Sequence, residues 1–264
     1  MNYSYIPISN TQLAMSLALV LITGLISTLM QLGLLKSLLW GTFRAFIQLT
    51  LIGYVLTYIF ETNRLYVIVP IIILMTFVAS REATRRIKKS PHNTMLLSFL
   101  SLTASTFIVG LIVVRLIISP QPWYSARVMI PIFGMILGNS MNAIALSLDR
   151  LYAEIHAHVN EVEQLLCLGA SPWEASREYV SRALQAGMMP TINSLMIVGL
   201  VSLPGMMTGL ILAGMNPQDA VRYQFVVLIM VAAAVAIGCL CMLGLSFRKM
   251  FTEDMALVEP LRHN

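Results

Sequence analysis

Residues 134–150, GMILGNSMNAIALSLDR, join an apolar stretch to a polar centre and a charged end. The segment is apolar enough to cross a bilayer, yet its middle reads Gly138-Asn139-Ser140-Met141-Asn142 and it finishes at Asp149-Arg150. Polar groups at membrane depth are costly unless they are satisfied, and they often mark functional sites. The stretch predicts a membrane helix with a polar contact at its middle, and it leaves open which structure the chain forms beyond Asp149.

The composition of the whole chain indicates an integral membrane protein. Hydrophobic residues make up 58% of the 264 residues and charged residues only 11%, which is far from the balance of a soluble domain. Continuous apolar runs predict helices, because backbone groups in lipid must be hydrogen-bonded within the segment. We therefore expect an all-α, polytopic fold that forms a single transmembrane domain over residues 1–264.

Seven runs approach the roughly 20 apolar residues that a helix needs to cross the hydrocarbon core. They cover residues 13–35, 45–60, 65–79, 95–118, 128–148, 191–212 and 225–247. The first run lacks the basic segment of a signal peptide, since no Lys or Arg precedes Lys36, and we expect it to remain as a membrane helix. About seven transmembrane helices are predicted.

The distribution of basic residues predicts the orientation of the chain. With the N-terminus outside, all but four of the 17 Lys and Arg residues fall on the inner side; the four are Arg64, Arg115, Arg127 and Arg222. Basic residues favour the cytoplasmic side of a membrane. The expected topology has the N-terminus outside and the C-terminus inside, and the net charge of +5 is explained by anionic lipid without nucleic acid.

The longest stretch between predicted spans, residues 149–190, has the pattern of two helices. Apolar residues recur at helical spacing from Arg150 to Leu168, and Gly169 is a typical residue just beyond a helix end. A second helix is predicted after it, because Ser171 and Glu174 form a capping box around Pro172 at the first helical position. This cytoplasmic amphipathic hairpin between spans five and six either lies on the lipid surface or is a rigid element against which a partner presses.

The hairpin resembles a known docking element. Glu163 and Gly169, six residues apart and followed by Ala170-Ser171-Pro172, are similar to the EAA loop of ATP-binding cassette (ABC) permeases, although Gln164 and Leu165 stand at its alanine positions. The resemblance implies that the short helices dock into a groove of a separate ATPase. The residues implied in coupling are Glu163, Gly169, Ala170, Ser171, Pro172 and Glu174.

Three further stretches carry a closer resemblance. GMILGNSMNA, LCLGASPWEAS and VGLVSLPGMMTGLILAGMNPQDAVRYQ are together similar to the FetB (YbbM-like) family of small membrane subunits. That likeness implies a permease of the bacterial inner membrane, a FetA-like ATPase partner and iron export, and plant relatives are linked to aluminium tolerance. It also implies that residues 149–190 are the cytoplasmic coupling segment of the permease.

The chain itself contains no nucleotide-binding motif. A P-loop requires Gly-Lys-Ser/Thr at the end of a glycine-rich turn, whereas the two Lys-Ser pairs here come directly after Leu35 and Lys88. We therefore expect a transport subunit without enzymatic activity or a cofactor of its own, whose partner binds ATP and Mg²⁺. No metal-binding residues are assigned.

Small and polar residues inside the predicted spans suggest either tight helix packing or a transport path. Gly134, Gly138 and Asn142 share one helix face, and small residues so placed let helices approach closely. Pro204 removes a backbone hydrogen bond where Gly205 adds freedom, which makes this point a candidate hinge. The candidate residues for the path or helix interface are Gly134, Gly138, Asn139, Ser140, Asn142, Pro204, Gly205, Met206 and Met207.

Two other patterns have ordinary explanations. The 18 methionines suit irregular or mobile packing better than metal binding. His156 and His158 lie two residues apart and so point to different sides of a helix, which favours a solvated face with Glu154 and Glu161 over a metal site.

The function favoured by these residues and resemblances is an ABC permease subunit that exports iron as a homodimer. Two alternatives remain open from sequence: an importer or flippase for an organic or lipidic substrate, and a membrane scaffold that transports nothing.

Overall fold

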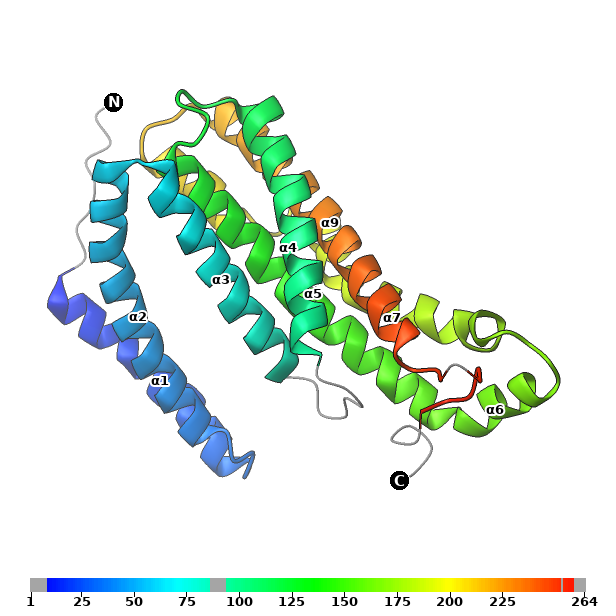
Figure 1. Ribbon diagram of the computed structural model, residues 1–264. Coiled ribbons are helices and arrows are strands. Elements are labelled where there is room, and N and C mark those ends of the chain that lie inside the picture. Colours follow the sequence, from blue (N-terminus) through cyan, green and yellow to red (C-terminus); the bar gives the residue numbers. More distant parts are fainter. Residues whose placement is uncertain (1–8, 86–93, 253, 259–264) are drawn as a thin grey trace. The chain divides into compact units, whose positions relative to one another are not determined.

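The computed structural model describes residues 9–85, 94–252 and 254–258, and its regular elements there are helices (Figure 1). The basic residues Arg86, Lys88, Lys89 and Arg262, which support the predicted orientation, lie outside the described residues. In chain order the elements are α1 (Asn10–Leu29), α2 (Leu35–Thr62), α3 (Leu65–Arg85), α4 (Met95–Ile112), the π-helix η1 (Val113–Ile118), α5 (Ala126–Ala157), α6 (Val159–Cys167), α7 (Pro172–Ile197), α8 (Gly205–Leu212) and α9 (Pro217–Arg248).

Six helical segments in the described part of the chain are long and apolar enough to cross a membrane, compared with the seven predicted. The predicted span over residues 191–212 is not one helix, because α7 ends at Ile197 and α8 begins at Gly205. Gly199 takes a positive φ of 83° between them, and the Gly199 amide donates to the Ser202 carbonyl at 2.9 Å. The apolar run of residues 191–212 therefore conceals a turn.

The chain divides into two compact units, the smaller of which comprises residues 1–62 and 210–215. In this unit α1 begins after a capping box of Ser9 and Gln12. A turn with positive φ at Gln31 and Gly33 leads into α2, so the predicted first span ends earlier than expected and the second is longer. Most side chains of α1 and α2 are exposed, and the large ones among them are mainly apolar, as suits helices surrounded by lipid or by other membrane helices.

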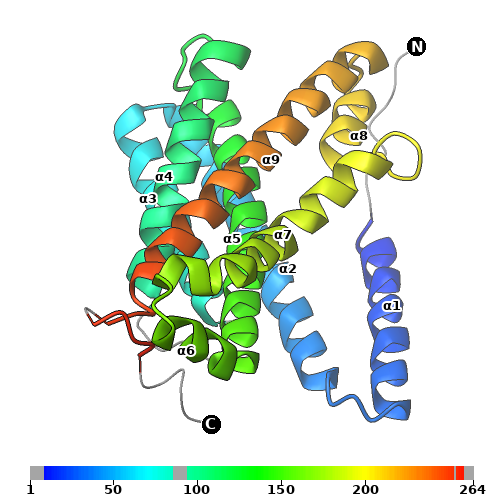
Figure 2. The ribbon, with the colours of Figure 1, turned by 90° about the vertical axis from the view of Figure 1, so that its right-hand side faces the viewer.

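The larger unit, residues 63–209 and 216–264, contains the core. In it α3 and α4 pack against α5, while α9 packs against α4, α5 and α7 (Figures 1 and 2). Phe133 of α5 is fully buried and meets Phe107 edge to face at 5.6 Å. A Cβ atom at Gly110 would lie only 2.8 Å from the Phe133 ring, so the small residue in α4 makes room for the aromatic ring in α5.

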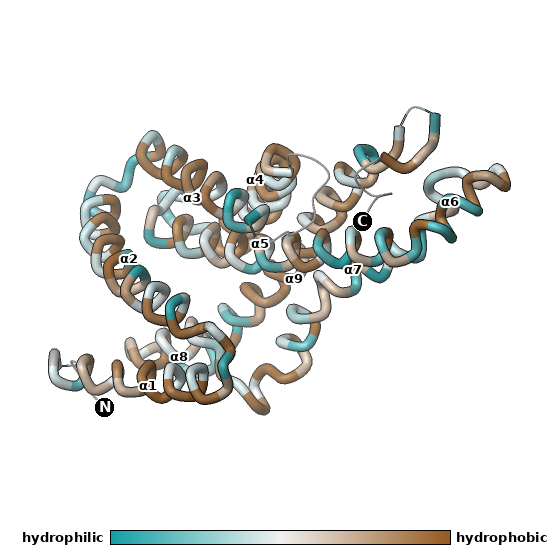
Figure 3. The backbone as a smooth tube through the Cα atoms, turned by 90° about the horizontal axis from the view of Figure 1, so that it is seen from below, coloured by the Kyte–Doolittle hydropathy of each residue, from teal (hydrophilic) through white to brown (hydrophobic). Residues whose placement is uncertain are grey.

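Helix α5 continues through Asp149 and Arg150 without a break, which corrects the expected boundary. Its 32 residues correspond to about 48 Å at 1.5 Å per residue, whereas the hydrocarbon core is about 30 Å thick. The expected inner helix over residues 150–168 is therefore split: residues up to Ala157 extend α5, and α6 begins after His158. Figure 3 shows hydrophilic residues recurring along α6 and the adjoining part of α7, in contrast to the apolar α3 and α4.

Candidate functional site: a helix corner, a polar cluster and a cavity

The corner between α6 and α7 has the local structure that its sequence predicts. Gly169 adopts φ +92°, and the amides of Gly169 and Ala170 donate to Leu166 and Leu165, each at 3.0 Å. These bonds satisfy carbonyls at the end of α6. Glycine is favoured here because side-chain-bearing residues rarely take this backbone conformation.

The first turn of α7 is closed by the predicted capping box. The Ser171 hydroxyl and amide donate to the Glu174 carboxylate at 2.7 and 2.8 Å, and the Glu174 amide donates back to the hydroxyl. These hydrogen bonds, that of the hydroxyl first, lower the pKa of Glu174, so the carboxylate that accepts them stays ionised at neutral pH. Pro172 occupies the first helical position, and the corner enters α7 with its amides satisfied.

Apolar side chains are exposed around this corner. Leu168 is 85% exposed and Trp173 is half exposed, while Glu163 is partly buried on α6. The Trp173 ring packs at 5.7 Å against Phe247 near the end of α9. The corner is thus fixed to α9 on one side and presents an apolar surface on the other.

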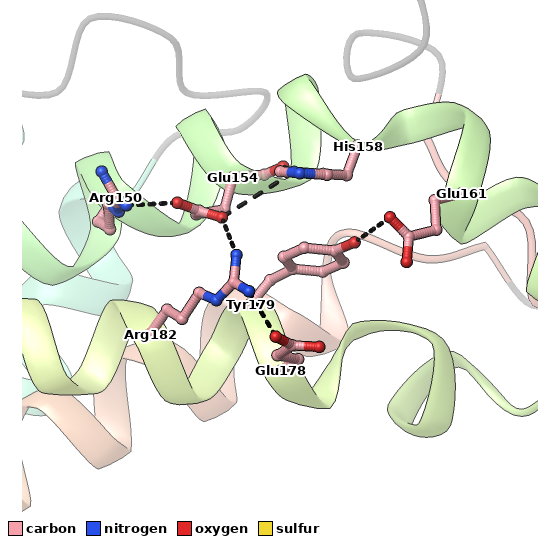
Figure 4. Close-up of polar contacts among 7 residues, drawn as sticks. All are labelled: Arg150, Glu154, His158, Glu161, Glu178, Tyr179 and Arg182. Atoms are coloured by element: carbon pink, nitrogen blue, oxygen red, sulfur yellow. Dashed lines mark hydrogen bonds and ion pairs between the residues drawn. The ribbon is translucent and has the colours of Figure 1, made fainter.

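A polar cluster joins the end of α5 to α6 and α7 (Figure 4). Glu154, only 7% exposed, pairs with Arg150 at 2.6 Å and with Arg182 of α7 at 3.2 Å. Arg182 also pairs with Glu178, one turn back on α7. The expectation of a solvated face was wrong for Glu154, because α7 packs over this side of α5.

Tyr179 forms the other half of the cluster. Its hydroxyl donates to Glu161 of α6 at 2.9 Å, and its ring stacks on His158 with centroids 4.9 Å apart. Burial, helped by Glu161, raises the pKa of Tyr179 to about 12, so the hydroxyl remains a donor throughout the physiological range. The cluster therefore fixes the first half of α7 to both α5 and α6.

We expect Glu154→Gln to lower the free energy of unfolding by about 1 to 2 kcal/mol, because α7 is held less firmly to α5. The change keeps the side-chain volume and removes the negative charge that pairs with both Arg150 and Arg182. Fully buried hydrogen bonds to charged groups contribute more to stability than the value expected here. The expected value is smaller because both arginines are about half exposed to solvent. The measurement is thermal unfolding of the purified protein in detergent.

Glu178→Gln is the matched control for this prediction. It removes a pair with the same Arg182, but Glu178 is 72% exposed, and surface pairs spaced four residues apart contribute about 0.3 to 0.5 kcal/mol. Equal destabilisation by the two variants would contradict the assignment of Glu154 as the centre of the cluster.

A cavity of about 470 Å³ lies between α5, α7 and α9 within the larger unit. Helix α5 contributes Met135, Asn139, Asn142, Ala143 and Leu146; α7 contributes Gly187, Pro190, Thr191 and Ser194; the segment from Val198 to Met206 and part of α9 complete the wall. The cavity falls within the roughly 300 to 1,000 Å³ typical of ligand sites.

The polar groups of the cavity are amides and hydroxyls. The Asn139 amide donates to the Met135 carbonyl at 2.8 Å, and the Ser194 hydroxyl donates to the Pro190 carbonyl at 2.9 Å. Gln224 of α9 is 5% exposed, and its Oε1 has no hydrogen-bond partner among the described residues. An unsatisfied buried amide oxygen is costly and points to a missing donor.

The cavity brings together some of the residues predicted for a transport path or a helix interface. Asn139, Asn142, Pro204, Gly205 and Met206 line it, whereas Ser140 is buried inside the bundle. Gly134 faces Met75 of α3, whose Cε lies 3.3 Å from a Cβ built at this position. Gly138 and Met207 are not among the lining residues, and in the described chain no atom lies within 4 Å of a Cβ built at Gly138 or Gly205.

Sequence reasoning did not find Gly187 or Gln224. A Cβ at Gly187 would lie 2.8 Å from the Ala143 carbonyl oxygen and 3.1 Å from the Cys239 sulfur, so at this glycine α7 packs directly against α5 and α9. Its sequence neighbours, Ala186 and Met188, give no such signal. Gln224 was detectable as an amide just before the apolar run of the last span, but its position in the cavity wall depends on the fold.

The lining of the cavity offers hydrogen-bonding and apolar groups. The described residues that line the cavity include no acid, base or cysteine, and in the described part of the chain no three His, Cys, Asp or Glu residues are grouped to hold a metal ion. The cavity can hold a ligand through hydrogen bonds and apolar contact.

The long apolar helices define the chain as a multi-pass helical membrane protein. Residues 10–251 match the family model described as uncharacterised protein family UPF0014, and the chain belongs to this family. The resemblance drawn from the three sequence stretches is confirmed.

Relatives match along nearly the whole chain. It is 35% identical to the probable iron export permease protein FetB of Escherichia coli, over 95% of each chain. It is 35% identical to the membrane protein YjkA of Bacillus subtilis, over 94% of this chain and 97% of that one. Protein ALUMINUM SENSITIVE 3 of Arabidopsis thaliana is 34% identical, over 92% of this chain and 88% of that one. No solved structure matches.

Proposed function

We propose that this chain is the membrane subunit of an ABC exporter that moves iron out of the bacterial cytoplasm and is driven by a separate ATPase. The chain is 35% identical to the probable iron export permease FetB of E. coli over 95% of each chain. This similarity supports iron as the transported metal and an ABC permease as the class of protein. In this proposal two copies form a homodimer in the inner membrane, with the N-terminus outside and the C-terminus in the cytoplasm.

The observation that carries the proposal is the continuity of α7. This helix starts at the Gly169–Pro172 corner and runs without interruption to Ile197. Gly187, Pro190, Thr191 and Ser194, in its second half, form one wall of the cavity. One continuous helix, with Pro190 inside it, therefore connects the proposed ATPase contact to the proposed path.

The contacts of α7 suggest a mechanism. The ATPase presses on the corner, formed by Gly169, Ala170, Ser171 and Pro172, and the polar cluster around Glu154 makes α6 and the end of α5 move with it. Gly187 allows close contact with α5 and α9 and acts as the pivot. Tilting about this point changes the width of the cavity, and the turn around Pro204 and Gly205 absorbs the motion.

The test is reconstitution with a candidate ABC ATPase from the same organism. Iron-stimulated ATP turnover and ATP-dependent iron movement into inside-out vesicles are expected, whereas the scaffold alternative predicts neither. Binding of the ATPase without turnover or transport would overturn the proposal.

Asn142→Leu is expected to reduce transport at least tenfold while the ATPase still co-purifies. Asn142 lines the cavity, and leucine replaces its amide with an apolar group of similar size, whereas the corner of α7 is unchanged. The control is Asn193→Leu, because Asn193 is exposed on α7 and is not among the lining residues. Transport that survives Asn142→Leu as well as it survives Asn193→Leu would contradict a path through this cavity.

A further inference from the structure

The charge of the cavity restricts what it can hold. Its lining residues include two Asn, one Gln, two Ser and one Thr, and every one of the described lining residues is uncharged. A bare cation in this site gives up part of its hydration to amides and hydroxyls, while the described lining residues offer no carboxylate or thiolate to balance its charge.

Charged residues near the cavity are directed elsewhere. Arg182 of α7 is paired with Glu154 and Glu178 and lies about 12 Å along the helix from Pro190, at 1.5 Å per residue. Arg222 is exposed and, two residues before Gln224, points roughly 200° away from it around α9. The cavity therefore receives no positive charge from these two arginines with which to hold an anionic complex.

Volume leads to the same conclusion. The cavity measures about 470 Å³, whereas one water molecule occupies about 30 Å³ in the liquid. The space is suited to a molecule of drug-like size. Apolar walls from Leu146, Val227 and Val231 fit the body of an organic ligand.

Gln224 supplies an independent indication of a ligand. Its side chain is 5% exposed and its Oε1 has no partner among the described residues, although Gln224 lines the cavity. Rotation of the Gln amide group about the Cγ–Cδ bond is only weakly restricted, so a ligand entering the cavity can reach either end of this amide.

We propose that the α5–α7–α9 cavity takes its cargo as an electrically neutral chelate of the metal, held by Gln224 and the neighbouring amides and hydroxyls, and not as a bare ion. The inference rests on the proposed export function, since it names the form in which iron occupies that site. It assigns the direct metal ligands to the chelator and leaves the protein to recognise the outer surface of the complex.

The experiment is equilibrium dialysis of the purified chain in nanodiscs, with protein-free nanodiscs as the blank. The probes are tris(maltolato)iron(III), which is neutral, tris(oxalato)iron(III), which carries three negative charges, and aquated ferrous ion. Saturable binding of the neutral complex is expected, displaced by its gallium counterpart and unaffected by the other two probes. Competition by aquated ferrous ion, or no saturable binding of the neutral complex, would overturn the inference.

Gln224→Leu should weaken binding of the neutral complex about five- to tenfold, the loss of one neutral hydrogen bond, and Gln218→Leu is the control because Gln218 is exposed outside the cavity. Equal effects of the two variants would count against the site. These measurements separate the two proposals. If vesicles transport aquated ferrous ion and the chain does not bind the neutral complex, the exporter proposal stands and the chelate proposal is wrong. If the chain binds the neutral complex and no ATP-dependent transport is found, the chelate site stands and the exporter proposal is wrong.

Discussion

Gly187→Ala is expected to destabilise the larger unit by about 1 to 3 kcal/mol, the usual cost of overpacking a tight core. The new methyl carbon would lie 2.8 Å from both the Ala143 carbonyl oxygen and the Ser147 Cβ. Neither atom belongs to the far end of a flexible side chain, so relief requires α7 to move away from α5. Because Gly187 also lines the cavity, transport should fall together with stability.

Cys239 provides a direct measure of that displacement. Its side chain is fully buried, and its sulfur lies 3.1 Å from the position of the added carbon. In a Cys167→Ser, Cys241→Ser background, Gly187→Ala should expose this thiol to maleimide labelling and lower the unfolding temperature.

Gly244→Ala is the control, because Gly244 lies in α9 and no atom of the described residues is within 4 Å of a Cβ built there. It is expected to leave stability unchanged or slightly raised, as alanine is the better helix former. An unreactive Cys239 and an unchanged unfolding temperature in Gly187→Ala would show that the close approach does not constrain α7.

The sequence predicts those features of the fold that depend on local chemistry. Hydropathy identifies the membrane class and the spans around α3, α4, α5 and α9, and the capping box at Ser171 and Glu174 was predicted correctly because its partners are three residues apart. The end of α5 was not predicted from the sequence, because the helix ends at His158, where neither Gly nor Pro marks a boundary. The turn at Gly199 was hidden within an apolar run that hydropathy alone treats as one span.

The candidate site was less predictable, because its residues meet only in the folded chain. Asn139 and Asn142 stood out as polar residues in an apolar segment, and both line the cavity. The importance of Gly187 depends on Ala143 and Cys239, which lie on other helices. The pairing of Glu154 with Arg182 joins residues 28 positions apart, which a search for helical i,i+4 pairs does not consider.

Gly169→Val is expected to uncouple this chain from its ATPase. Gly169 has φ +92°, and within the described chain no atom lies within 4 Å of a Cβ built there, so the effect arises from backbone conformation and not from a clash with neighbours. Left-handed conformations cost side-chain-bearing residues about 1 to 2 kcal/mol, and a β-branched residue is especially unfavourable. Relief of this strain changes the angle between the end of α6, which carries Leu168, and the start of α7, which carries Trp173, and so alters the apolar surface on which we expect the ATPase to press.

Co-purification of the ATPase and transport-linked ATP turnover together measure this uncoupling. Gly169→Val should lower both several-fold, whereas the unfolding temperature should change little, since the polar cluster around Glu154 still fixes the first half of α7. Gly169→Asn is the graded control, because asparagine tolerates positive φ better than other residues with a side chain, and it should retain most of the coupling. If Gly169→Val binds the ATPase and supports transport as the parent does, the corner is not the coupling element, and the alternatives of a lipid-surface hairpin or a scaffold become the better explanations of residues 149–190.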